Sequence, residues 1–262
     1  MSNSTLLYGQ LMGYLRQHSR YRDLRHLKAL GWMVSALVGS GQLSLAAWEP
    51  YVSSRAQSAQ SSERRWQRFM SNARIRMRSL YLPLVMVALQ GWQSHRLYLA
   101  LDTTMLWERY CMIHLSVVCC GRAVPLLWRV LEHGSATVAF GEYEGLLRQA
   151  RWLLRHHPDV MLLADRGFAN HDMMAWLRSS RWHYCLRLPC DVLLHGPRRY
   201  PTTVGSMYPP LGEARLYRHV GLWLDGLHRC NLVLATVFWG QRNLGQWSPM
   251  SLLPCRRSGN MP

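Results

Sequence analysis

Lysine is nearly absent from this chain. Lys28 is the single lysine among 31 basic residues, and the rest are arginine. A Walker-type phosphate loop needs a lysine after a glycine-rich run, so that class of nucleotide site is excluded. The seven cysteines form no Cys-x-x-Cys pair. A zinc module is therefore not predicted, and we expect buried, reduced thiols.

Long apolar runs are also missing. The longest apolar stretch, from Leu80 to Leu89, is too short to cross a bilayer and contains Pro83. No basic segment leads into an apolar core at the N-terminus, so the sequence shows no export signal. We therefore expect a cytoplasmic protein with no membrane partner.

Acidic residues are scarce. The 14 Asp and Glu against 31 Lys and Arg leave a formal net charge of +17, and the first 97 residues hold 13 basic and only 3 acidic side chains. Such an excess predicts a polyanionic partner, and the arginine fork matches phosphate oxygens. A GC-rich coding sequence also enriches arginine, so composition alone leaves both explanations open.

The N-terminal third has a helical pattern. Apolar residues at spacings of three and four predict two helices between residues 5 and 45. A further helix is predicted from Ser61, with Trp66 and Phe69 facing inward. Six arginines within fifteen residues, opposed only by Glu63, favour contacts with DNA phosphates over an ordinary solvated face. These are Arg64, Arg65, Arg68, Arg74, Arg76 and Arg78.

Two aspartates end short apolar runs. Residues 97–101 lead into Asp102, and residues 160–164 lead into Asp165. Runs of this length predict buried strands. An aspartate at a strand end is more often a turn or cap residue than a metal ligand. Two carboxylates on neighbouring strands, however, repel each other unless a cation lies between them, which favours Mg²⁺ or Mn²⁺.

The predicted order of the elements indicates that the strands ending in Asp102 and Asp165 are neighbours in the sheet. Residues 111–120 and 123–131 predict a hairpin around Gly121, followed by helix, strand, helix and strand up to residue 188. A three-strand meander followed by this alternation is typical of an α+β (mixed α/β) ribonuclease H-like core. In such a core the first and fourth strands lie side by side, so Asp102 and Asp165 would share one site.

We divide the chain into four segments. Residues 1–95 form a helical, basic, DNA-binding region, 96–188 the first part of the catalytic core, and 189–238 a β-rich insertion with a hairpin signal at Asp225-Gly226. Residues 239–262 have no acidic residue and no periodicity. We hypothesise that a frameshift near Phe238 replaced the original C-terminus with this irregular tail.

Two of these motifs carry a family resemblance. Together with the β-rich segment after Cys190, Leu99-Ala100-Leu101-Asp102-Thr103-Thr104 and Leu162-Leu163-Ala164-Asp165-Arg166-Gly167-Phe168 resemble the DDE transposases of the insertion sequence 4 family, over about residues 20 to 238. The resemblance implies metal-dependent cleavage at transposon ends and strand transfer, by a homodimer. It makes Asp102 and Asp165 the metal-binding catalytic acids. DNA, as terminal repeats and target, is the implied partner, with a nucleoid-associated location. Arg166 is expected to orient Asp165 or to touch phosphate.

The chain departs from that family at its third acid, a glutamate within a Tyr, Arg, Glu, Lys signature. The acids after Asp165 are Asp172, Asp191, Glu213 and Asp225, and none lies in that setting. We therefore expect very weak or no strand transfer. Two alternatives stay open: another ribonuclease H-like nuclease, or a DNA-binding remnant that inhibits an intact transposase. Metal-dependent cleavage and end joining distinguish the three.

Overall fold

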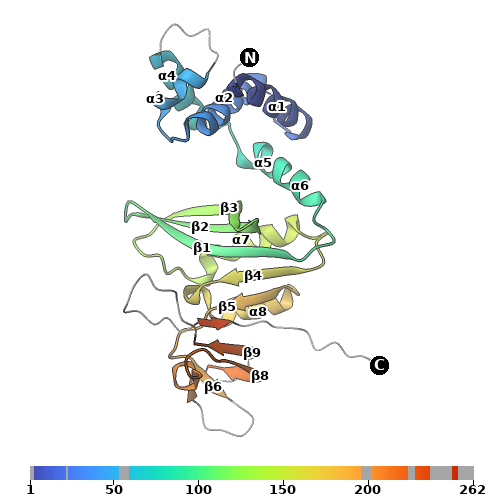
Figure 1. The fold of residues 1–262 in the computed structure, drawn as a ribbon, viewed down its shortest axis with the longest axis vertical. Coiled ribbons are helices and arrows are strands. Elements are labelled where there is room, and N and C mark those ends of the chain that lie inside the picture. Colours follow the sequence, from blue (N-terminus) through green and yellow to red (C-terminus); the bar gives the residue numbers. More distant parts are fainter. Residues whose placement is uncertain are drawn as a thin grey trace. The chain divides into compact units, whose positions relative to one another are not determined.

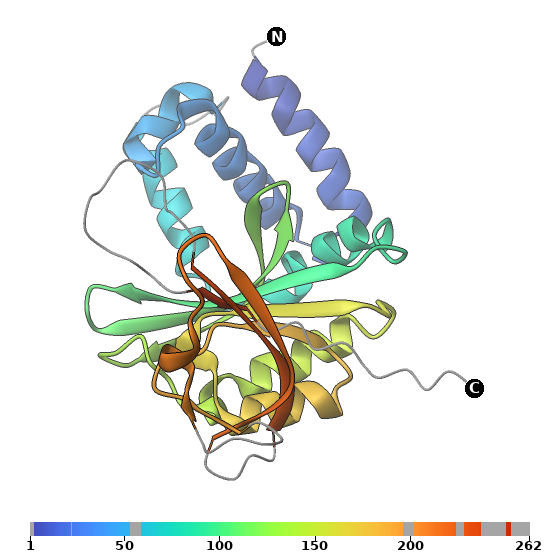
Figure 2. The ribbon, with the colours of Figure 1, turned by 60° about the horizontal axis from the view of Figure 1, so that its bottom comes forward.

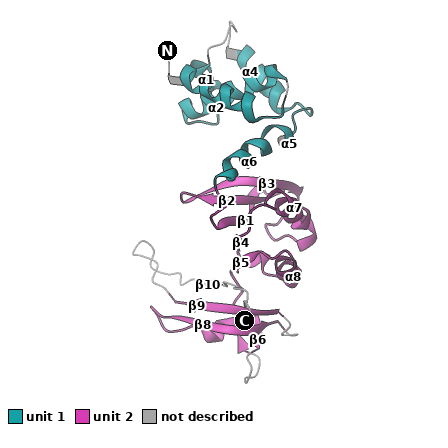
Figure 3. Ribbon diagram, turned by 90° about the vertical axis from the view of Figure 1, so that its right-hand side faces the viewer, with its two compact units in different colours: residues 1–91 teal, residues 92–262 magenta. Residues whose placement is uncertain are grey.

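The computed structural model describes residues 3–21, 23–52, 59–195, 202–223, 228–236 and 250–252. The chain forms two compact units, residues 1–91 (unit 1) and residues 92–262 (unit 2), coloured separately in Figure 3. The Asp225-Gly226 turn and most of residues 239–262 lie outside the described residues. The division into four segments stays a prediction.

The described part of unit 1 is helical. Its elements are α1 (Asn3–His18), α2 (Leu24–Ser40), α3 (Leu45–Trp48), η1 (Glu49–Tyr51), α4 (Ala59–Met70), α5 (Met77–Leu80) and α6 (Leu82–Gln90), as Figure 1 shows. Helix α2 begins at Asp23, whose carboxylate accepts the Arg25 N–H at 2.9 Å. It ends at Gly41, which takes a φ of 66° and donates its N–H to the Leu37 carbonyl.

Two small apolar clusters hold these helices together. Met33, Ala36, Trp48 and Trp66 form one cluster, with the partly buried Phe69 packed against it. The inward orientation predicted for Trp66 and Phe69 is therefore confirmed. The second cluster joins α1 and α2 through Met12, Leu15 and Leu27. Leu80 of α5 and Leu84 of α6 pack against the second cluster, so the end of unit 1 is joined to its first two helices.

The described residues of unit 2 form two five-stranded sheets. The strands of the first sheet are β1 (Leu97–Leu106), β2 (Tyr110–Cys119), β3 (Arg122–Glu132), β4 (Val160–Ala164) and β5 (His183–Leu186). They are ordered β3-β2-β1-β4-β5, with β1 antiparallel to β2 and parallel to β4. The predicted mixed fold class with a ribonuclease H-like strand order, in which the first and fourth strands are neighbours, is confirmed.

Helices α7 (Phe140–Leu153) and α8 (His171–Ser179) lie on the same side of this sheet (Figure 2). They contact each other, and they also contact β3 and β5 respectively. In β1 the side chains of Leu97, Leu99 and Leu101 are buried, whereas Tyr98 and Asp102 are exposed. This period-two alternation places the polar residues of β1 on the face away from α7 and α8.

The second sheet has the order β10-β9-β8-β6-β7. It is built from β6 (Leu193–His195), β7 (Thr202–Thr203), β8 (Ala214–Leu222), β9 (His228–Ala235) and β10 (Met250–Leu252), with η3 (Val204–Met207) after β7. Strand β9 contacts α8, which joins this sheet to the first. Strand β10 falls within residues 239–262, most of which lie outside the described residues, so the proposed irregular tail stays a prediction.

The cysteines and the apolar helices bear on two further predictions. The six cysteines of the described residues form no disulfide, but only Cys111 and Cys230 are buried, so the prediction of buried thiols holds for two of them. Among the described residues no single helix is long and apolar enough to span a membrane. Only α2 with the segment Leu45–Tyr51, bent by 93°, meets the length and composition that a span requires.

Candidate active site

The two predicted acids occupy neighbouring positions of adjacent strands. The parallel pairing of β1 and β4 matches Leu101 with Ala164, so Asp102 and Asp165 follow one step further along their strands. Asp165 has an extended backbone, with φ −77° and ψ 170°, so the alternation of side chains continues through it. Neighbouring strands lie about 4.8 Å apart. Both carboxylates are therefore carried on the face away from α7 and α8, and both residues are exposed.

The same register continues across the whole sheet. Asp102 pairs with His114 of β2, and His114 pairs with Trp128 of β3. On the other side Ala164 pairs with Leu186, which places Arg187 beside Asp165. One line of side chains thus crosses five strands. We call it the polar row: Trp128, His114, Asp102, Asp165 and Arg187.

Arg187 makes the strongest contact within the polar row. Its Nη1 lies 3.1 Å from the Asp165 Oδ1, and its backbone N–H donates to the Ala164 carbonyl at 3.1 Å. The Asp165 side chain is 51% exposed and that of Arg187 38%, so water weakens this ion pair. The guanidinium nevertheless places a positive charge at the carboxylate that the sequence predicts as a metal ligand.

Asp102 is held by its own neighbours. Its Oδ1 accepts the backbone N–H of Thr103 at 2.8 Å, and the Thr103 hydroxyl donates to the Ala136 carbonyl at 3.0 Å. Next to it, the two ring nitrogens of His114 lie 3.4 Å from the Thr104 hydroxyl and 3.3 Å from the Ser116 hydroxyl. These bonds orient the carboxylate and the imidazole on the open face of the sheet.

Asp165 is positioned by the buried side of the segment that follows it. Phe168, in the short helix η2 (Arg166–Phe168), is 4% exposed and packs edge-to-face on Tyr143 at 5.3 Å. The Tyr143 hydroxyl accepts a bond from Asn170, whose Oδ1 caps α8 by accepting the Met173 N–H at 2.9 Å. Burial raises the pKa of the Tyr143 phenol, so it stays neutral in this role. Arg166, by contrast, points into solvent.

The donor set suits a hard divalent ion but is incomplete. Two exposed carboxylates on adjacent strands fit Mg²⁺ or Mn²⁺, which take oxygen ligands and keep several waters. Within the described residues, however, no group of three or more His, Cys, Asp or Glu is placed to hold a metal. Neither Asp172, Asp191 nor Glu213 supplies the third acid; Glu213 instead pairs with Arg215 at 3.1 Å. Asp225 lies outside the described residues.

The arginines predicted to contact DNA divide into separate environments. Arg64, Arg65 and Arg68 are exposed on α4, and Arg74 and Arg76 are exposed in the segment after it. Arg78 belongs to α5, but its side chain lies outside the described residues. Of the five whose side chains are described, only Arg65 and Arg68 line a pocket between α2 and α4. The structure therefore distinguishes side chains that the sequence pattern treats alike.

Sequence reasoning missed His114, Trp128 and Arg187. Arg187 follows an apolar strand directly, as Asp165 does, so the same pattern was available to find it. His114 and Trp128 lie in the middle of their strands, where only the pairing register brings them beside Asp102. A single sequence does not show that register.

Comparisons with known proteins are sparse. No protein-family model and no curated protein matches this chain. Among solved structures, the cryo-EM structure of a piggyBac transposase synaptic complex with hairpin DNA aligns over 100% of this chain and 63% of its own, at 10% identity and a TM-score of 0.44. Clostridium butyricum Argonaute bound to guide and target DNA aligns over 75% of this chain and 27% of its own, at 8% identity and a TM-score of 0.30. With scores this low, the functional argument rests on the sequence and the site geometry.

Proposed function

We propose that this chain is a DNA transposase of the DDE type, related to the insertion sequence 4 family, with cleavage activity that is very weak or lost. The adjacent register of Asp102 and Asp165, on a sheet face that α7 and α8 leave open, carries the proposal. Two acids at neighbouring positions suit metal-dependent phosphodiester chemistry. The surplus of arginine suits DNA as the substrate.

Residues of the polar row and their neighbours in the sequence would have separate roles in the reaction. The carboxylates of Asp102 and Asp165 would hold the metal, which when bound polarises the phosphate and activates water. Thr103 keeps Asp102 oriented through its backbone N–H. Arg187 and Arg166 would bind the non-bridging phosphate oxygens, because guanidinium groups match them in a bidentate manner. The same arginines draw the anionic backbone of DNA towards the acids.

The missing third acid lowers the expected activity. Two carboxylates leave more of the metal shell to water, and the Arg187 ion pair competes for one of them. These observations also favour the second candidate function, a non-catalytic DNA-binding remnant that occupies transposon ends and inhibits an intact copy. We extend the proposal to terminal-repeat and target DNA as partners, a homodimer, and a nucleoid-associated location in the cytoplasm.

Metal binding and cleavage test the proposal separately. We expect Mn²⁺ titrated into the full chain and followed by electron paramagnetic resonance to bind weakly, and binding to be lost in Asp102→Asn and Asp165→Asn. Asp191→Asn is the matched control, because that exposed acid lies outside the polar row. Equal Mn²⁺ binding by all four proteins would contradict the site.

Cleavage of DNA carrying transposon ends, with Mg²⁺ or Mn²⁺, then decides between the two functions. We expect nicking at or barely above background for the wild-type chain. Robust nicking that Asp102→Asn abolishes would show an active enzyme, and joining of the cut ends would identify it as a transposase and not another nuclease.

A further inference from the structure

Unit 1 contains a pocket that the proposed chemistry does not use. It opens between α2 and α4 and has a volume of about 510 Å³, within the size range of small-molecule sites. Its lining combines cationic, polar and aromatic side chains, most of them from α2 and α4, which pack directly on each other, with Val52 and Asn72 from the segments after η1 and α4. Such a mixture differs from an apolar gap between helices, which would have no charged wall.

The charge of the pocket selects an anion. Arg25, Lys28, Arg65 and Arg68 line it, and no carboxylate of the described residues does. The nearby Asp23 neutralises part of the Arg25 charge, through an Nη2 to Oδ2 contact of 3.1 Å. Within the described residues no carboxylate pairs with the other three cations. A phosphate group is the ligand that several converging cations of this kind bind most readily.

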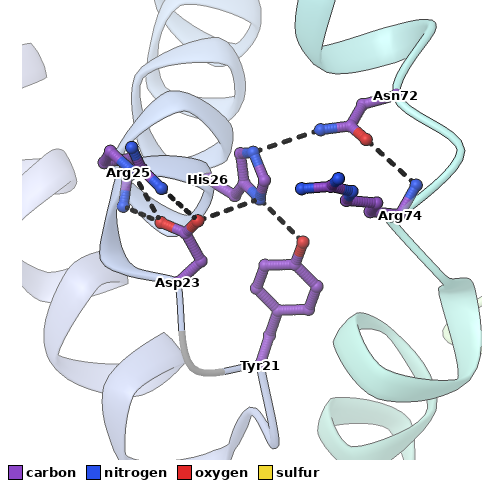
Figure 4. Close-up of polar contacts among 6 residues, drawn as sticks. All are labelled: Tyr21, Asp23, Arg25, His26, Asn72 and Arg74. Atoms are coloured by element: carbon purple, nitrogen blue, oxygen red, sulfur yellow. Dashed lines mark hydrogen bonds and ion pairs between the residues drawn. The ribbon is translucent and has the colours of Figure 1, made fainter.

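His26 lines the pocket, and hydrogen bonds to Asn72 and Tyr21 hold its ring in place (Figure 4). The backbone N–H of Arg74 donates to the Asn72 Oδ1 at 2.9 Å, and this bond fixes the orientation of the Asn72 amide. Its Nδ2 therefore donates to the His26 Nε2 at 3.2 Å, which leaves the Nδ1–H of His26 to donate to the Tyr21 hydroxyl at 2.7 Å. This chain of bonds ties α2 to the segment after α4. The pocket is thus held in shape without a ligand.

The aromatic part of the lining is suited to stacking. Trp32 is partly exposed and is held by a parallel stack on Tyr8, with ring centroids 3.9 Å apart. Phe69 is also partly exposed and meets His26 edge-on at 6.2 Å. Rings fixed in this way lose little entropy when a flat ligand packs on them. A nucleobase is a flat ligand that is linked to a phosphate.

We propose that this pocket binds one unpaired nucleotide of a DNA strand. Its phosphate would lie against Lys28, Arg65 and Arg68, and its base against Trp32 and Phe69. Cationic grooves with aromatic side chains are the usual means of holding single strands, whereas a paired duplex presents no free base face. The proposal takes DNA as the polymer from the proposed function but does not depend on the acids of unit 2.

The test compares DNA ends with and without unpaired nucleotides. Binding of the full chain to a fluorescently labelled duplex is measured by anisotropy for a blunt end, a three-nucleotide overhang and an abasic overhang of equal length. We expect the overhang to bind about 10-fold more tightly than the blunt end, because one stacked base contributes that much. The abasic overhang, which keeps the phosphates, should lose most of this preference.

Adjacent arginines provide a matched control. Arg65→Ala and Lys28→Ala should abolish the preference for the overhang, whereas Arg64→Ala, one residue away on α4 and outside the pocket, should preserve it. Trp32→Leu should lower the preference while circular dichroism shows an unchanged fold. Equal binding of blunt and overhanging ends by the wild-type chain, or equal losses in Arg64→Ala and Arg65→Ala, would overturn the proposal.

The result is independent of the active site. Asp102→Asn and Asp165→Asn should keep the overhang preference in full, even though they lose Mn²⁺. Failure of the pocket proposal would therefore leave the metal site untouched, and a failed metal site would leave the pocket result standing.

Discussion

At the scale of single residues, Arg187 would compete with a bound metal ion for the carboxylate of Asp165. The Arg187 guanidinium lies 3.1 Å from the Asp165 Oδ1, where a divalent ion would bind. A guanidinium offsets the repulsion between Asp102 and Asp165 but cannot activate water as a metal does. The strength of the ion pair between Arg187 and Asp165 therefore affects how tightly this chain binds a metal ion.

We therefore predict that Arg187→Ala binds Mn²⁺ more tightly than the wild-type chain. The ion pair is partly exposed, so its loss should change the dissociation constant by only about 2- to 5-fold. Arg187→Lys keeps the charge and should bind as the wild type does. Calorimetry of Mn²⁺ binding to the three proteins measures the effect. Weaker binding by Arg187→Ala would instead mean that Arg187 orients Asp165 for the metal.

The residues of the site were only partly readable from the sequence. Asp102 and Asp165 stand out because an apolar run stops abruptly at each of them. Their proximity followed from element order, since the first and fourth strands of this topology are neighbours. His114 could not be predicted as a site residue, because the sequence around a strand residue does not show which residue it faces on the next strand. Which residue faces Asp102 depends on long-range register.

At the scale of elements, close approach of helices in unit 1 depends on glycine. A Cβ added at Gly39 of α2 would lie 2.5 Å from the Tyr51 ring, too close for a real contact. A Cβ at Gly13 of α1 would meet nothing within 4 Å. Both glycines are helical, so alanine gains the same helix propensity at either site. Only the packing differs between them.

The two alanine variants should thus change stability in opposite directions. Gly13→Ala should raise the free energy of unfolding by up to about 1 kcal/mol. Gly39→Ala should lower it by about 1 to 3 kcal/mol, because overpacking against the Tyr51 ring outweighs that gain. Urea unfolding followed by circular dichroism measures both. A stabilised Gly39→Ala would show that Tyr51 moves aside at little cost.

Whether a segment forms a helix or a strand was easier to predict than the register between paired strands. The hairpin between β2 and β3 was marked by Gly121, which together with Cys120 takes a positive φ in the turn. The register shift between Leu115 and Ser116, opposite Pro125, had no comparable mark. Proline is tolerated there because β3 is an edge strand of its sheet. Where such a shift falls depends on packing across strands, which a local pattern does not contain.

At the scale of the whole molecule, nearly all of the positive charge is guanidinium. Residues 1–91 hold 12 basic and 3 acidic side chains, and residues 92–262 hold 19 and 11, yet Lys28 is the only lysine in either. Each phosphate contact adds about 0.9 to the salt dependence of binding to duplex DNA. Amine-specific chemistry therefore removes one side-chain charge from the entire molecule, and that charge lies in the unit 1 pocket.

Acetylation of the folded chain should consequently separate general attraction from pocket binding. The reagent removes the charges of Lys28 and of the N-terminal amine and leaves 30 arginines untouched, so we expect the salt slope for blunt duplex DNA to fall by about 1.8 at most, about 0.9 for each amine. The preference for an unpaired overhang should fall several-fold, because Lys28 loses its charge at the site of the nucleotide. Lys28→Arg is the control, because its arginine keeps the positive charge and is not acetylated. In this variant the reagent modifies only the N-terminal amine, so any change in binding is due to that group. If acetylated Lys28→Arg lost the preference as far as the acetylated wild type does, the amine at residue 28 would have no part in holding DNA. The N-terminal amine, which is the group modified in both proteins, would then account for the loss.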